Sequence, residues 1–178
     1  MNGLMRAALW GLATVAVAAA VHIGSVHALP HLIMGGAMHV IEGRVGINHM
    51  AFAGRPNAAS RGVVRPSPDL LYSTCVFDLS HGPVRVRASA MPDTYWSVSL
   101  FDADTNNFYV LNDRQAKTGG VDFTIVPPSQ DKQPFGNVVR SPTVRGLVLF
   151  RTLIDDEAKL KEIDAARRHA SCAPFQAG

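Results

Sequence analysis

The pattern of hydrophobic and polar positions divides the chain into one unbroken apolar stretch and a longer region of alternation. No charged residue occurs between Arg6 and Glu42, and residues 7–29 are almost wholly apolar. About 20 apolar residues are enough to cross a bilayer as a helix. The pattern therefore predicts that residues 1–30 are a membrane anchor with a single span.

The flanks of this stretch indicate its orientation. Arg6 lies on the side that the positive-inside rule assigns to the cytoplasm, so the chain beyond Pro30 is expected outside it. A cleaved signal peptide is the alternative, because Val26 to Ala28 offer a small-residue cleavage pattern. The apolar region of a signal peptide is shorter, about 7 to 15 residues. Under both interpretations the rest of the chain is exported.

Residues 31–68 lie between the anchor and the alternating region. Residues 31–42 are apolar but include two glycines, which predicts a short interfacial helix or a helix continued past a kink at Pro30. Residues 43–68 are rich in Gly, Pro, Asn and Arg and are expected to form an irregular connector.

Histidine and methionine are frequent near the start of this segment, and both side chains can bind cuprous copper. The residues concerned are His31, Met34, Met38, His39, His49 and Met50. Methionine at helical spacing more often fills apolar contacts. We therefore expect neither a metal site nor a cofactor.

From Asp69 onward the pattern changes to a period of two, which is typical of strands. Strands are predicted at residues 71–79, 84–88, 95–101, 108–111, 121–126, 137–140 and 146–154. Short strands separated by frequent turns predict a mainly β domain over residues 69–178, either an antiparallel sandwich or a partly open barrel.

A helix is predicted from Asp156 to about Ala170, with Arg167, Arg168 and His169 favouring its negative end. Cys75 lies in the first predicted strand and Cys172 follows the helix. In an exported protein such a pair is expected to form a disulfide, here joining the helix to the sheet. A nucleophilic Cys75 is the alternative, with His81 as its nearest histidine.

The charge pattern and the catalytic motifs restrict the function only in part. The net charge is +3 and the basic residues are scattered, so nucleic acid is not an expected partner. The sequence contains no GxSxG elbow, P-loop, HExxH or dinucleotide fingerprint. Whether the protein is an enzyme stays open at this point.

The stretch from Phe101 to Asp113 contains the largest group of acidic and amide side chains that could bind a ligand. Its acidic and amide side chains approximate the spacing of a calcium loop, with Asn107 in place of the invariant glycine. The alternative is a strand-connecting turn, because Asp and Asn bond their own backbone. The candidate ligand-facing or partner-facing residues are Asp69, Tyr72, Asp102, Asp104, Asn106, Asn107 and Asp113.

Several motifs together resemble a bacterial family called domain of unknown function 1254. They are Leu71-Tyr72-Ser73, Phe77-Asp78-Leu79-Ser80, His81-Gly82-Pro83, Tyr95-Trp96-Ser97-Val98 and Thr105-Asn106-Asn107-Phe108. The resemblance implies an exported β-sandwich-like domain, often accompanied by a domain of unknown function 1214 that this chain is expected to lack. The family's Asn-x-Asp-Thr-Leu-Tyr segment reads Pro66-Ser67-Pro68-Asp69-Leu70-Leu71-Tyr72 here, so the asparagine is absent.

Two hypotheses of function follow. The first is a module of the bacterial inner membrane with a cytoplasmic N-terminus, whose periplasmic domain binds a companion envelope protein. The second is an envelope enzyme acting on a small organic or envelope substrate. Its cleft would be lined by Asp69, Tyr72, Asp102 and Asn106.

Overall fold

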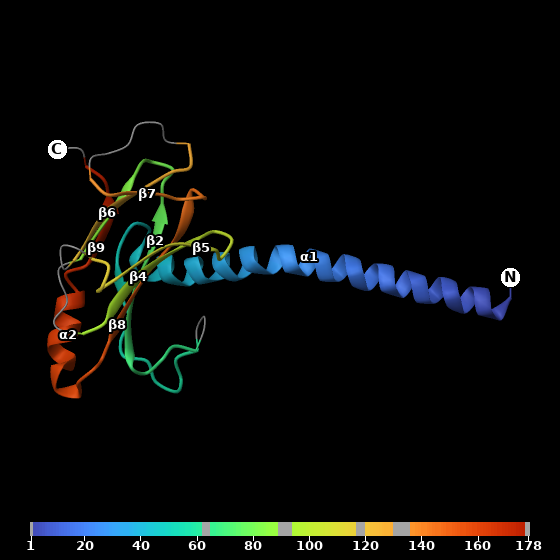
Figure 1. The fold of residues 1–178 in the computed structure, drawn as a ribbon, viewed down its shortest axis with the longest axis horizontal. Coiled ribbons are helices and arrows are strands. Elements are labelled where there is room, and N and C mark those ends of the chain that lie inside the picture. The colour runs from blue at the N-terminus through green and yellow to red at the C-terminus, as the bar shows by residue number, and fades with distance from the viewer. Residues whose placement is uncertain (1, 62–64, 89–93, 117–119, 130–135, 177–178) are drawn as a thin grey trace.

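One long helix projects from a domain made mostly of strands (Figure 1). The computed structural model describes residues 2–61, 65–88, 94–116, 120–129 and 136–176. Helix α1 spans Gly3–Val45 and runs through Pro30 without a break, so the helix continues past this proline instead of restarting. Its 43 residues correspond to roughly 65 Å of helix. Within the described residues α1 is the one helix long and apolar enough to cross a membrane, as the sequence predicts.

In the described part of the chain, nine strands form two sheets. They are β1 (Ala51–Phe52), β2 (Leu70–Asp78), β3 (Val84–Ala88), β4 (Trp96–Asp102), β5 (Asn107–Asn112), β6 (Val121–Val126), β7 (Val138–Arg140), β8 (Arg145–Leu153) and β9 (Ser171–Pro174). The first sheet has the order β1-β2-β8-β4-β5 and the second β7-β6-β3-β9. All pairs are antiparallel except β6 with β7. The predicted β-rich fold is confirmed.

The core lies between the two sheets. Strand β8, predicted from its apolar run, is the central strand of the first sheet, and Val148 and Phe150 on alternate positions are buried. Burying a side chain of that size contributes roughly 1.5 to 3 kcal/mol. At Gly146 a Cβ atom would lie 2.3 Å from the carbonyl oxygen of Phe101, so only glycine fits where β8 passes β4.

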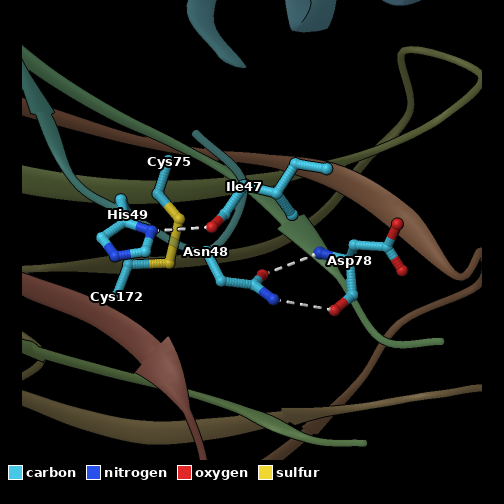
Figure 2. The surroundings of a disulfide bond; sticks show 6 residues. All are labelled: Ile47, Asn48, His49, Cys75, Asp78 and Cys172. Atoms are coloured by element: carbon cyan, nitrogen blue, oxygen red, sulfur yellow. Dashed lines mark hydrogen bonds between the residues drawn. A yellow bond between two sulfur atoms is a disulfide. The ribbon is translucent and has the colours of Figure 1, made fainter. Parts of the chain in front are cut away.

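Two short strands, β1 and β9, were not predicted from the sequence pattern. Each lies at one edge of its sheet. Strand β1 pairs with β2, and β9 pairs with β3. The predicted disulfide between Cys75 and Cys172 is present, as Figure 2 shows. Because Cys172 lies in β9, the bond joins the two sheets instead of tying a helix to a sheet.

The C-terminal helix is shorter than predicted. A 3₁₀ turn at Glu157–Lys159 precedes α2, which spans Leu160–Arg167. Asp156 begins this region as expected, since its side chain accepts a hydrogen bond from the backbone N–H of Ala158 at 2.9 Å. The helix ends early because the chain must extend into β9 from Ser171.

Candidate functional site

The last third of α1 packs on the outer face of the first sheet. Met34 and Met38 are each 6% exposed, whereas the residues of α1 before Pro30 are almost all exposed. Both methionines pack against the buried Val76 of β2. The two thioethers considered as copper ligands therefore fill an apolar contact. Partly buried side chains that join this cluster are Ile41, Phe101 and Leu147.

The register of the strands gives the direction in which α1 crosses the sheet. Leu147 of β8 is paired with Val76 of β2 on one side and with Phe101 of β4 on the other, so these three residues form one row across the strands. Adjacent strands lie about 4.8 Å apart, so the row from β2 to β4 covers about 10 Å. The seven positions from Met34 to Ile41 cover about the same length of helix. Helix α1 therefore runs across the strands and, followed along the chain, passes from the β4 side to the β2 side.

Polar contacts hold α1 at both ends of this crossing. Towards its C-terminal end, Glu42 forms an ion pair with Arg145, whose Nε lies 3.4 Å from a carboxylate oxygen of Asp78. At the other end, Nε2 of His31 lies 2.8 Å from a carboxylate oxygen of Asp104. These contacts lie about three turns of helix apart, so they define the direction of α1 on the sheet at two points.

Asp78 also forms hydrogen bonds with the segment that follows α1. The side chain of Asn48 accepts a hydrogen bond from the backbone N–H of Asp78 at 2.9 Å and donates one to its carbonyl oxygen at 3.1 Å (Figure 2). Partial burial acts to raise the pKa of the Asp78 carboxyl, but hydrogen bonds from Ser80 and the charge of Arg145 outweigh it. The pKa is therefore lower than usual.

The turn between β4 and β5 is organised by Asp102, which is only 3% exposed. Its carboxylate accepts hydrogen bonds from the backbone N–H groups of Asp104 and Asn106 at 2.9 and 2.8 Å, and from the Asn106 side chain at 3.0 Å. Thr105 has a φ of 70°, a conformation that β-branched residues rarely adopt. The turn thus exposes Thr105, Asn106 and Asn107. The hydrogen bonds to the buried Asp102 carboxylate hold its backbone in place.

The residues proposed for a calcium loop do not converge. Asp113 lies beyond the opposite end of β5, where its backbone N–H bonds the carbonyl oxygen of Trp96. The carboxylate of Asp102 is instead occupied by N–H donors of its own turn. Within the described residues no cluster of three or more His, Cys, Asp or Glu side chains could hold a metal ion.

The structure also separates the four residues of the hypothetical catalytic cleft. Asp69 and Tyr72 lie at the start of β2, where Leu70 is paired with Leu153 at the end of β8. Asp102 is paired with Gly146 at the opposite end of β8. Seven residues of a strand cover roughly 23 Å, so the two pairs do not form one cleft. The hydroxyl of Tyr72 instead accepts a hydrogen bond from the N–H of Ser67 at 2.9 Å.

Sequence reasoning expected Arg167 only to favour the negative end of a helix, and it missed the burial of this side chain. Its guanidinium is buried beside β1 and β2, with Nη1 2.8 Å from the carbonyl oxygen of Tyr72 and Nη2 2.6 Å from that of Ala53. Asp164 forms an ion pair with it at 2.5 Å, and the Phe52 ring lies 5.8 Å away. Its position three residues after a carboxylate could have suggested a pair, but nothing in the sequence indicates its burial.

A cavity of about 720 Å³ opens between the sheets beside β5 and β6. Its apolar wall includes Tyr109 and Phe123, whose ring centroids lie 5.2 Å apart. Burial raises the pKa of the Tyr109 phenol. Arg85 and Asp122 form a bidentate pair at its rim, and this pairing lowers the pKa of the Asp122 carboxyl. The described lining includes none of the seven candidate residues from the sequence.

A solved structure with a TM-score above 0.5 shares this fold. The VPA0106 protein from Vibrio parahaemolyticus is 18% identical, with a TM-score of 0.60 over 82% of this chain and 37% of the other. A putative uncharacterized protein from Burkholderia cenocepacia is 16% identical, with a TM-score of 0.48 over 73% of this chain and 35% of the other. The chain thus spans little more than a third of the length of these relatives.

No curated protein matches the sequence. The family model described as "Protein of unknown function (DUF1254)" matches residues 47–174, from the segment after α1 to the end of β9. This match covers well over half of the chain and agrees with the resemblance that the sequence motifs carry. The chain therefore belongs to the DUF1254 family of proteins of unknown function.

Proposed function

We propose that this protein is a membrane-tethered module whose exported domain binds a companion envelope protein. Helix α1 is the anchor, with Arg6 on the cytoplasmic side of a bacterial inner membrane and the β domain in the periplasm. The disulfide between Cys75 and Cys172 supports an oxidising compartment. The larger size of the relatives that share this fold supports the idea that the domain works together with a further protein unit.

The observation that carries the proposal is the turn between β4 and β5. It exposes Thr105, Asn106 and Asn107, while the buried Asp102 fixes its backbone. A preformed polar turn loses little conformational entropy when it is bound, which favours a binding role. Strained backbone such as that at Thr105 concentrates at functional sites.

The test is a pull-down with full-length protein from detergent-solubilised membranes. The wild type is compared with an Asp102→Ala and Asn106→Ala double variant and with Asn107→Lys, which adds a charge without removing an internal hydrogen bond. Asn57→Ala is the matched control, because Asn57 also bonds its own turn, through Oδ1 and the N–H of Ala59.

We expect a stoichiometric companion whose retention falls at least tenfold in both turn variants and is unchanged in the control, as for a contact contributing about 1.4 kcal/mol or more. A companion retained equally by all four proteins would exclude the turn as its contact. No stoichiometric companion in any sample would contradict the binding function.

The cavity between the sheets favours a second candidate, an envelope enzyme acting on a small organic substrate. Its volume of about 720 Å³ lies within the usual range for ligand pockets. The half-buried Tyr109 would then donate its phenolic proton or a hydrogen bond to the substrate. A substrate screen against wild type and Tyr109→Phe tests this role, and turnover that is unchanged in the variant would exclude Tyr109 from the reaction.

A further inference from the structure

The docked part of α1 fixes how the domain is oriented on its anchor. Glu42 pairs with Arg145 beside Asp78 at the end of β2, whereas His31 contacts Asp104 in the turn between β4 and β5. Since β5 is next to β4 and forms the edge of the sheet, it is the last strand near α1 before the helix leaves the domain. Figure 1 shows β5 beside α1 at this point, with α2 on the opposite side of the domain.

The length of α1 gives the height of this edge above the membrane. His31 follows Arg6 by 25 positions, which correspond to roughly 37 Å of helix. The hydrocarbon core of a bilayer is about 30 Å thick, and the headgroup layers bring the total to about 40 to 45 Å. With Arg6 at the cytoplasmic boundary of the hydrocarbon, His31 lies about 7 Å beyond the opposite boundary, at the level of the headgroups.

The side chains of β5 and of the turn before it suit a position among lipid headgroups. Asp104, the acidic side chain at the tip of the turn, is paired with His31. The neighbouring exposed side chains of Thr105, Asn106 and Asn107 are polar and uncharged, and Val110 on β5 is 48% exposed. Uncharged polar groups beside an apolar one match a layer of zwitterionic headgroups, whereas anionic lipids would select for clustered Lys and Arg.

We infer that β5 and the turn between β4 and β5 rest against the lipid headgroup layer on the exported side, with the strands of the sheet roughly parallel to the membrane. This inference relies on the anchor role of α1 in the proposed function. A companion protein that contacts the turn must then itself lie in or on the same membrane, because the turn is not accessible from the open periplasm.

The test measures depth in vesicles of phosphatidylcholine that contain the full-length protein. An environment-sensitive fluorophore is attached to a single introduced cysteine in Asn107→Cys, Val110→Cys or Lys161→Cys, while Cys75 and Cys172 stay joined in their disulfide. Lys161 is the control because it is exposed on α2, which packs beside β1 through Arg167 at the edge opposite β5. The quencher is a nitroxide carried on the lipid headgroup.

We expect the headgroup nitroxide to quench the fluorophore at least threefold more strongly at positions 107 and 110 than at position 161. Equal quenching at all three positions in protein that floats with the vesicles would overturn the inference and leave the anchor intact. Failure of the protein to float with the vesicles would refute the anchor, and the inference with it.

Discussion

Helix α2 and the last third of α1 both pack against the five-stranded sheet, but they are attached by different means. At α2 the attachment centres on Arg167, which is 1% exposed and bonds backbone carbonyls of two other segments. At α1 it combines two buried methionines with Arg145, whose side chain is 39% exposed. A buried guanidinium is tolerated only when its donors are satisfied, whereas an exposed one can lose its partner to water.

This difference indicates that α2 is part of the folded domain and that α1 is a docked element. Loss of the α2 contacts leaves unpaired polar groups inside the protein, so it should destabilise the whole domain. Loss of the α1 contacts exposes a small apolar patch and an ion pair that water can solvate. The domain should therefore remain folded when α1 is released.

The largest effect is expected from removing the disulfide between Cys75 and Cys172. Replacing Cys75 and Cys172 by serine should lower the free energy of unfolding by about 4 to 5 kcal/mol, because a crosslink over 97 positions strongly restricts the unfolded chain. Denaturant unfolding of full-length protein in detergent, followed by circular dichroism, measures this loss. The oxidised and reduced wild type provide the control, and equal stability of the two would contradict the prediction.

The next effect concerns the buried guanidinium. Arg167→Met should cost about 3 kcal/mol of unfolding free energy, because it leaves the carbonyl oxygens of Tyr72 and Ala53 without this donor. Arg168→Met is the matched control, since Arg168 pairs with the same Asp164 at 2.9 Å but is 52% exposed. The loss of unfolding free energy in Arg168→Met should stay below about 1 kcal/mol. Similar losses in both variants would show that burial does not distinguish the two arginines.

Release of α1 should have a local effect. Met34→Ala combined with Met38→Ala removes two buried side chains, each worth about 2 kcal/mol, from the contact with Val76. Amide hydrogen exchange in residues 31–45 should accelerate more than tenfold, while the unfolding midpoint of the domain changes little. Leu32→Ala with Ile33→Ala is the control, because both side chains are exposed. Global unfolding in the methionine variant would show that α1 belongs to the domain core.

The smallest effect is expected from acid. At Asp164 partial burial acts to raise the pKa of the carboxyl, but hydrogen bonds from Arg168 and Arg167 outweigh it and lower the pKa below its ordinary 3.8. The pKa of Asp78 at the α1 contact is lowered in the same direction. A carboxyl whose pKa is lower in the folded state stabilises the protein above its unfolded pKa, and this contribution disappears as the pH falls through the folded value.

Unfolding free energies measured between pH 5 and pH 2.5 should therefore decrease below about pH 4. Asp164→Asn should show a shallower decrease than the wild type, because the mutated side chain no longer titrates. An unchanged slope in this variant would mean that Asp164 does not contribute to the acid sensitivity of the α2 attachment.

The sequence predicted the strands well wherever a strand is long enough to show a period. Strands β3 and β6 begin and end at the predicted residues, and β8 begins and ends one residue earlier than predicted. Strand β1 has only two residues and β9 contains a proline, so neither carries a readable alternation. Their positions follow from pairing partners that are remote in the sequence.

The candidate site was predictable only in its local part. The alternation of Asp and Asn from Asp102 to Asn107 indicated a self-bonded turn, and that turn is present. The distance between Asp69 and Asp102 depends on the pairing of both β2 and β4 with β8, which no local pattern contains. The helical spacing of the methionines indicated apolar packing, and Met34 and Met38 do fill an apolar contact, but the sequence did not indicate that Val76 is their partner.

The sequence by itself determined an uncharged apolar stretch long enough for a bilayer, an alternating β-rich domain and a cysteine pair suited to a disulfide. Each of these depends on local composition or period, which a chain carries before it folds. The tertiary structure alone decided that Arg167 is buried, that α1 is docked across the sheet and that the turn before β5 contacts α1 where the helix leaves the domain. These features arise from contacts between segments far apart in the chain, and their free energies exist only when the sheets have formed.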